Sequence, residues 1–233
     1  MNSPDNHHLA IVFDFGGVLL DWSPHYLYRK LFDGDDQAID RFLEHIHFES
    51  WNREQDAGRP FAVAVEVLCQ QYPEYCDLIR AYDERWVESL GGPIQPSVEV
   101  LRDLKDAGYT LHALSNWSVE KYNLVRGRYD FLNWFETVII SGEVRLVKPD
   151  LRIYQLLLDK IQRLPGECLV IDDSPANIAA ARQLGFKTIH FQSGEQLRGE
   201  LLEWGFRFGA ESVSQQKTSS QTPAPGLSSG LAR

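Results

Sequence analysis

Four short polar groups stand where apolar runs of the sequence end, and their residue types suit phosphoryl transfer. They are Asp14, Ser115 with Asn116, Lys148, and Asp172 with Asp173. A carboxylate that attacks phosphorus forms an aspartyl-phosphate, which divides one difficult hydrolysis into two easier steps. Because a carboxylate and a phosphate dianion repel each other, such a site needs a positioned lysine and a cation with oxygen ligands, such as Mg²⁺. Asp14 is the candidate nucleophile, and Lys148 and Asp173 are candidates for the cationic support.

Each of these groups has a simpler explanation when it is taken alone. A single Asp after a strand is more often a helix cap or a turn residue, and a Lys beside a Pro is usually a solvated loop charge. The four groups follow successive strand-like runs, however, and parallel strands place their carboxyl ends at one edge of a sheet. The order therefore favours one site over four unrelated caps.

The apolar runs themselves predict five short strands. These runs cover residues 9–15, 110–116, 137–141, 168–173 and 187–191. Segments with apolar residues at helical spacing alternate with the later runs, at 96–108, 120–129, 149–161 and 175–185. The alternation predicts an α/β fold in which helices wrap a parallel sheet.

Residues 22–92 interrupt this alternation, because they contain helix-like segments and no run typical of a strand. The glycines and prolines of GGPIQP at 91–96 predict a turn and a hinge where the interruption ends. We therefore expect a helical insert at 22–92 and a core at 9–21 and 93–209. Residues 210–233 are rich in Ser, Gln and Pro, which predicts a disordered tail.

Composition excludes several classes of function. The 233 residues are 43% hydrophobic, which is enough for one core with an inserted subdomain. A net charge of −10 argues against a nucleic-acid partner. No apolar run reaches the length of a membrane span and no signal segment is visible, so we expect a cytoplasmic protein without a membrane partner. Cys69, Cys76 and Cys168 lack metal or disulfide spacing and are expected to be buried thiols.

Taken together, the four groups make residues 9–205 resemble the haloacid dehalogenase (HAD) superfamily of hydrolases. The matching segments are FDFGGVLLD at 13–21, LSN at 114–116, KP at 148–149 and IDDS at 171–174. The resemblance implies a Rossmann-like core with an all-helical cap of the C1 type inserted after the first strand. It implies Mg²⁺ as the cofactor and a small phosphorylated metabolite as the partner of a monomer or homodimer.

The resemblance also assigns roles at the metal. Asp14 would be both the nucleophile and a metal ligand. The backbone carbonyl of Gly16 would be a second ligand and Asp173 the main acidic ligand. Asp172 would act through a metal-bound water.

The remaining groups would hold the phosphoryl group. Ser115 would donate its hydroxyl to the phosphoryl oxygens, with help from Asn116 and from backbone amides of the turn that contains Gly16. Lys148 would neutralise the phosphate and the nucleophile together, so that its role is catalytic as well as binding.

Gly16 departs from the usual pattern of the family. Phosphatases of this family usually carry a second Asp two residues after the nucleophile. This second Asp protonates the leaving alcohol and then activates water. Positioned proton transfer is typically worth about 10²- to 10⁴-fold in rate. One resolution is a phosphatase for a substrate whose leaving group needs less protonation, such as a hexose 1-phosphate.

Two other hypotheses of function compete with the phosphatase hypothesis. A 2-haloacid dehalogenase would use the same nucleophile and needs no acid, because halide leaves without a proton. The paired carboxylates of Asp172 and Asp173 argue against it, since clustered carboxylates need a cation to offset their repulsion. A non-catalytic binding protein that keeps the fold is the third reading.

Residues outside the four groups are candidates for the substrate pocket. Arg53, Gln55 and Arg59, in the polar stretch 49–60 of the insert, are candidates for substrate contact, although solvated surface charge explains them somewhat better. Trp22 and Trp117 directly follow the motifs and either line the pocket or belong to the core.

Overall fold

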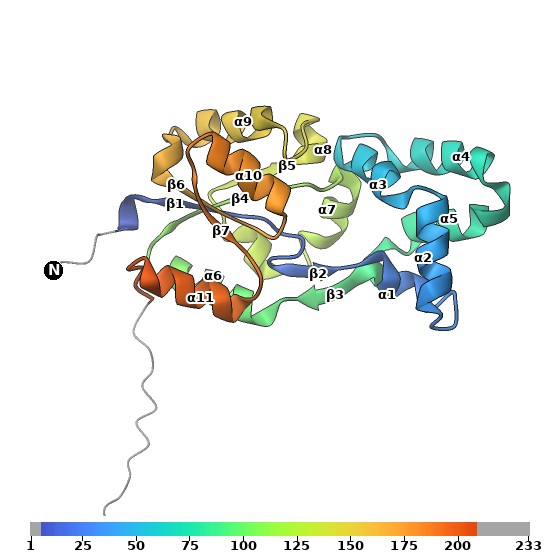
Figure 1. Cartoon of the computed structure of the whole chain (residues 1–233), viewed down its shortest axis with the longest axis horizontal. Coiled ribbons are helices and arrows are strands. Elements are labelled where there is room, and N and C mark those ends of the chain that lie inside the picture. The colour runs from blue at the N-terminus through green and yellow to red at the C-terminus, as the bar shows by residue number, and fades with distance from the viewer. Residues whose placement is uncertain (1–5, 209–233) are drawn as a thin grey trace, which may run out of the picture.

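A five-stranded parallel sheet forms the centre of the computed structural model, which describes residues 6–208 (Figure 1). Its strands are β1 (Ala10–Phe13), β4 (Thr110–Ser115), β5 (Thr137–Ile140), β6 (Cys168–Asp172) and β7 (Lys187–His190). The order β5-β4-β1-β6-β7 places β1 in the middle, and every neighbouring pair is parallel. The five predicted strands and the parallel sheet are confirmed.

Helices cover both faces of this sheet, as Figure 1 shows. On one face lie α9 (Leu151–Ile161) and α10 (Pro175–Gln183), and on the other lie α6 (Gln95–Asp106) and α11 (Gly194–Glu203). Two short helices follow β4 and β5, namely α7 (Val119–Val125) and α8 (Ser141–Val144). Single 3-10 turns cover Asn6–His8, Pro73–Tyr75, Trp86–Ser89, Asp130–Asn133 and Pro165–Glu167. Between residues 6 and 208, no helix is both long enough and apolar enough to cross a membrane.

The central strand β1 is apolar throughout because both of its faces are buried. Side chains alternate along a strand, so Ala10 and Val12 pack in the apolar cluster that contains α9 and α10. Ile11 and Phe13 pack in the opposite cluster, which contains α6 and α11. The run therefore continues without polar residues until Asp14, where the strand leaves the sheet.

A helical insertion between β1 and β4 forms the cap. Its helices are α1 (Pro24–Tyr28), α2 (Asp36–His45), α3 (Phe48–Asp56), α4 (Phe61–Gln71) and α5 (Cys76–Glu84). They extend to one side of the sheet in Figure 1, beyond the carboxyl ends of β1 and β4. The predicted helical insertion is confirmed.

The two ends of the insertion form a small antiparallel ribbon, which the sequence did not predict. Strand β2 (Leu20–Trp22) pairs with β3 (Leu90–Pro93), where we expected only a turn. Gly91 permits this pairing, because a Cβ there would lie 2.3 Å from Asp21 Oδ2. The Tyr26 hydroxyl donates a hydrogen bond of 2.6 Å to the same Asp21 carboxylate, which ties α1 to the ribbon. Both predicted boundaries of the insert fall in this ribbon, and the predicted tail at 210–233 lies outside the described residues.

The prediction of three buried thiols is wrong for two of the cysteines. Cys69 and Cys76 form a disulfide between α4 and α5, with 4.6 Å between their Cα atoms. The turn at Pro73–Tyr75 reverses the chain between the two helices, and this reversal brings together residues that are seven positions apart. Cys168 in β6 is buried and free.

Candidate active site

The carboxyl ends of β1, β4 and β6 bring the predicted polar groups to one edge of the sheet. Phe13 pairs with Ala113 on one side and Ile171 on the other, so the residues that follow leave the sheet together. The backbone N–H of Asp14 continues this pairing by donating to the Ile171 carbonyl at 3.0 Å. Asp14, Asp172 and Asp173 are thereby placed side by side.

Lys148, from the loop between α8 and α9, lies at the centre of this cluster. Its ammonium nitrogen is 2.8 Å from Asp14 Oδ2 and 2.7 Å from Asp172 Oδ2, and it donates to the Leu114 carbonyl at 2.9 Å. The side chain is only 1% exposed. Burial disfavours its charge, but the two carboxylates outweigh this effect and raise the pKa of Lys148 above its usual value. The lysine is therefore a fixed cation that joins the ends of β1 and β6.

Asn116 holds the backbone of Lys148 in place. Its Oδ1 accepts a hydrogen bond from the Lys148 N–H at 2.8 Å, and its Nδ2 donates to the Lys148 carbonyl at 3.0 Å. Both polar atoms of the amide are thus used to position the lysine loop. The contact between Asn116 and phosphate that the resemblance implied stays a prediction.

Asp172 is fully engaged by its neighbours. It is 1% exposed, and besides Lys148 its carboxylate accepts from the Ser174 N–H at 2.9 Å and from Asn177 Nδ2 at 2.9 Å. Asn177 was not among the predicted residues, although it stands in the first turn of α10 immediately after the motif. These contacts orient Asp172 toward Lys148 and leave Asp173 as the more accessible carboxylate.

The electrostatics of the cluster suit a divalent cation. Burial raises the pKa of Asp14 to about 6, Lys148 opposes the shift, and the charges of Asp172 and Asp173 add to it. Partial desolvation and the charge of Asp172 also raise the pKa of Asp173. One oxygen from each of the three carboxylates lies within 4.8 Å of the others. Carboxylate oxygens are ligands that Mg²⁺ prefers, and a bound cation would offset the repulsion among these three groups.

The two glycines after the nucleophile differ in what surrounds them. At Gly17, φ is +71°, and a Cβ would lie 2.1 Å from Asp173 Oδ2, so this position needs glycine both for its backbone and for its space. At Gly16 a Cβ would have no atom within 4 Å. The missing acidic side chain therefore leaves open space beside the nucleophile.

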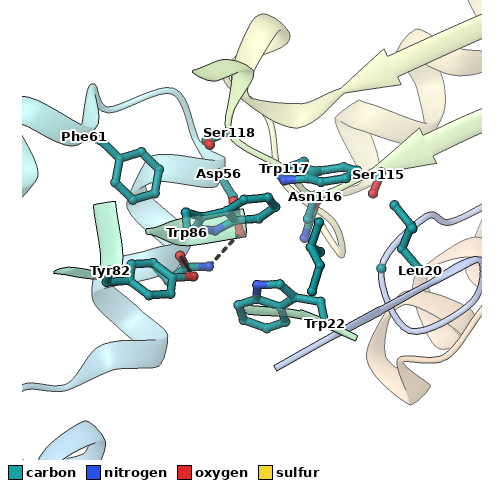
Figure 2. Close-up of a pocket in the computed structure, with 13 residues that line it drawn as sticks. Leu20, Trp22, Asp56, Phe61, Tyr82, Trp86, Ser115, Asn116, Trp117 and Ser118 are labelled. Atoms are coloured by element: carbon teal, nitrogen blue, oxygen red, sulfur yellow. Dashed lines mark hydrogen bonds between the residues drawn. The ribbon is translucent and has the colours of Figure 1, made fainter. Parts of the chain in front are cut away.

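A cavity of about 80 Å³ opens from Gly16 toward the cap (Figure 2). Its core side carries Ser115, Asn116, Trp117 and Ser118, and its other walls are mainly apolar and aromatic. These other lining residues are Leu20, Trp22, Asn52, Asp56, Phe61, Tyr82, Trp86 and Leu90. Trp22 and Trp117 thus line the pocket, which was one of the two alternatives that the sequence left open.

The cap residues that reach the cavity are not the predicted ones. Arg53 is exposed, Gln55 is buried and bonds to the Trp51 carbonyl, and Arg59 pairs with Glu54. None of the three predicted residues lines the cavity. Asn52 and Asp56 line it instead, because they are four residues apart and therefore share one face of α3. Helical spacing grouped these two residues in the sequence, but it could not show which face of α3 meets the core.

Comparisons of the sequence with known proteins identify a family and several relatives. The haloacid dehalogenase-like hydrolase family model matches residues 8–185. A phosphorylated carbohydrates phosphatase from Thermotoga maritima is 24% identical over 184 residues, which cover 78% of this chain and 83% of the relative. A sesquiterpene phosphatase from Aspergillus oryzae is 24% identical, with 78% and 88% covered. A drimenol cyclase from Aspergillus calidoustus is 23% identical over 91% of this chain, which spans only 40% of the cyclase.

Solved structures share the fold. A HAD family enzyme from Bacteroides thetaiotaomicron, solved as a magnesium complex, superposes with a TM-score of 0.65 at 21% identity and covers 83% of this chain and 98% of that chain. L-2-haloacid dehalogenase from Xanthobacter autotrophicus superposes with a TM-score of 0.56 at 22% identity, with 83% and 82% covered. The same architecture therefore occurs in a magnesium-binding protein and in a dehalogenase.

Proposed function

Because the chain belongs to the haloacid dehalogenase-like hydrolase family, we propose that its active site is that of a magnesium-dependent phosphatase for small phosphorylated metabolites. The observation that carries this proposal is the group of three convergent carboxylates beside Lys148. Displacement of a halide from carbon needs no cation, so it gives no reason to gather three carboxylates at the nucleophile. Two relatives that are named as phosphatases support the same reaction.

The metal would be held by Asp14, Asp173 and the carbonyl of Gly16. Asp172 would act through a bound water, since its oxygens already accept hydrogen bonds from Lys148, Ser174 and Asn177. When bound, Mg²⁺ would draw charge from the phosphoryl oxygens and offset their repulsion of the nucleophile.

The protein side chains would carry the remaining chemistry. Asp14 Oδ1 accepts from the Phe15 N–H at 2.7 Å and Oδ2 lies against Lys148, so the carboxylate is fixed before it attacks phosphorus. Ser115 would donate to a phosphoryl oxygen, and Lys148 would keep Asp14 ionised and neutralise charge as the phosphoryl group is transferred. A water would then hydrolyse the aspartyl-phosphate and restore Asp14.

The leaving group would occupy the cavity beneath the cap. Its walls of Trp22, Phe61, Tyr82 and Trp86 suit a group with an apolar face, and a sugar ring has such a face. A hexose 1-phosphate remains our proposal for the substrate. A cytoplasmic location remains a prediction from the sequence.

A substrate panel with and without metal tests the proposed function. We expect p-nitrophenyl phosphate, glucose 1-phosphate and glucose 6-phosphate to release phosphate in the presence of Mg²⁺ and to release none with EDTA. Glucose 1-phosphate should be the better of the two glucose esters if the leaving group needs little protonation. Release of chloride from L-2-chloropropionate in EDTA, without release of phosphate from any ester, would contradict the proposal and establish a dehalogenase.

Gly17→Ala is expected to weaken the response to magnesium. The new Cβ would displace the Asp173 carboxylate, so we expect the Mg²⁺ concentration for half-maximal activity to rise by roughly 10- to 100-fold, as for other disturbances around metal ligands. The matched control is Gly34→Ala in the cap, where φ is +83° and a Cβ meets no atom within 4 Å. Both variants should lose roughly 1–2 kcal/mol of stability from the left-handed backbone. An equal change in magnesium response in both would show that displacement of Asp173 is not the cause.

A further inference from the structure

The reaction proposed above needs a proton for the leaving alcohol, and Gly16 does not supply one. Among the described residues that line the cavity, Asp56 is the only carboxylic acid. Tyr82 is the other titratable group there, but burial, followed by the charge of Asp56, raises the pKa of its hydroxyl well above 10. Asp21, the acidic residue that follows the motif, lies in the ribbon bonded to Tyr26 and does not line the cavity.

Asp56 is fixed against the core although it belongs to the cap. Its backbone carbonyl accepts a hydrogen bond of 2.6 Å from Ser141 Oγ, and this hydroxyl accepts from the Trp117 N–H at 2.9 Å. The next turn reinforces the contact, since a Cβ on Gly58 would lie 2.8 Å from the Gly142 carbonyl. Ser141 is fully buried and follows β5 directly. The last turn of α3 is thus held at the loop that follows Ser115, the last residue of β4.

The carboxyl group of Asp56 points into the cavity, among the aromatic side chains. Figure 2 shows it near Tyr82, Trp86 and Trp22, with Ser115 on the opposite side of the view. Asn52 Nδ2 donates to Asp56 Oδ2 at 3.3 Å, and the Ser118 N–H also donates to this carboxylate.

The surroundings of Asp56 keep a proton available near neutral pH. Burial raises the pKa of Asp56 to about 7, and the charge of Asp14 adds to this effect. The Ser118 N–H and the charge of Arg53, on the same helix, oppose it. A general acid works best when its pKa lies near the working pH.

We propose that Asp56 is the proton donor to the leaving oxygen, supplied by the cap in place of the acidic side chain that is absent at Gly16. This inference rests on the proposed phosphatase function. In the first step, Asp14 forms a bond to phosphorus, the bond from phosphorus to the leaving oxygen breaks, and that oxygen takes its proton from Asp56. In the second step, the oxygen of a water forms a bond to phosphorus while the Asp56 carboxylate takes a proton from that water, the bond from phosphorus to Asp14 breaks, and phosphate leaves. Asp56 is then protonated again.

Three substrates of similar size and different leaving groups test the proposal. We would measure kcat/KM for p-nitrophenyl, phenyl and benzyl phosphate, whose leaving groups need increasing protonation. Asp56→Asn should lower the value for benzyl phosphate by about 10²- to 10⁴-fold and that for p-nitrophenyl phosphate by less than about 10-fold. A loss of equal size on all three would overturn the proposal and leave the phosphatase function standing. If the unmodified protein hydrolyses none of them with Mg²⁺, the phosphatase function fails and this proposal fails with it.

Asp83→Asn is the matched control for loosening of the cap. Asp83 is another cap carboxylate at the junction with the core, but it pairs with Lys121 and does not line the cavity. Its replacement should change the three kcat/KM values by one common factor. A selective loss for benzyl phosphate in this control would overturn the assignment to Asp56.

One further measurement needs no variant, and another combines two substitutions. In the unmodified protein, the ratio of kcat/KM for benzyl phosphate to that for p-nitrophenyl phosphate should fall as pH rises through about 7, because the donor loses its proton. A ratio that does not change with pH would overturn the proposal.

The substitution Gly16→Asp places a carboxyl group in the open space beside the nucleophile. It should increase hydrolysis of benzyl phosphate far more in Asp56→Asn than in the unmodified protein. Equal gains in both backgrounds would show that the two carboxyl groups do not serve one role.

Discussion

Asp14→Asn is expected to abolish turnover while the fold stays intact. Asparagine has nearly the same shape as aspartate, but its amide is a very poor nucleophile toward phosphorus, so the aspartyl-phosphate cannot form. Loss of a covalent nucleophile typically lowers kcat by more than about 10⁴-fold. The strand should be unaffected, because the Asp14 N–H, which bonds to Ile171, belongs to the backbone.

The assay for this variant is phosphate release from p-nitrophenyl phosphate, combined with circular dichroism to check the fold. The matched control is Asp106→Asn, an exposed carboxylate at the end of α6 that should behave like the unmodified protein. If Asp14→Asn keeps more than about a hundredth of the original rate, another group must attack phosphorus. A burst of p-nitrophenol in the unmodified protein would show the covalent intermediate directly.

Lys148→Met is expected to damage both activity and stability. The variant removes the cation that lies within 3 Å of Asp14 and Asp172 and leaves their carboxylates buried without it. Removal of one partner from a buried ion pair typically costs about 3–5 kcal/mol. Loss of a positioned charge at the phosphoryl group should lower kcat by about 10²- to 10³-fold.

The stability deficit of Lys148→Met should depend on pH in a definite direction. The folded pKa of Lys148 is raised, so its contribution is fully present below the unfolded pKa of the lysine and would fade only in strong base. The orphaned carboxylates become neutral as pH falls through the raised pKa of Asp14, which is about 6 with the lysine present and higher without it. The deficit should therefore be large at pH 8 and smaller at pH 5.

Urea denaturation at the two pH values, in the presence of EDTA, measures this effect. Lys30→Met is the control, because Lys30 pairs with Glu88 at the surface and such pairs contribute at most about 1 kcal/mol. A deficit for Lys148→Met that is as small as that of the control, or that grows toward pH 5, would contradict the role assigned to the buried cation.

The sheet and the polar groups at its edge could be predicted because their signals are local. The run before Asp14 is apolar on both faces of a central strand. The later strands also place apolar residues on both faces of the sheet. Parallel strands end at one edge, so the order of Ser115, Lys148 and Asp172 along the chain was enough to place them together.

The contribution of the cap could not be predicted because it depends on packing between distant segments. In sequence, Asp56 stands among exposed charged residues and resembles a solvated position. It reaches the cavity only because Gly58 lets α3 approach Gly142 and because Ser141 binds the end of the helix. The β2–β3 ribbon was not predicted for a similar reason. The local sequence around Gly91 is typical of a turn, and its pairing as a strand depends on Asp21, which is distant in sequence.

The ribbon has a consequence for how such a protein can diversify. Trp22 and Leu90 pair with each other in the ribbon, so the chain enters and leaves the cap at adjacent points. A segment with adjacent ends can be grafted between homologous proteins by recombination without rerouting any strand of the recipient. One exchange of residues 23–89 would transfer Asn52, Asp56, Phe61 and Tyr82 as a unit. New substrate preferences could therefore be acquired in a single event rather than by successive point mutations.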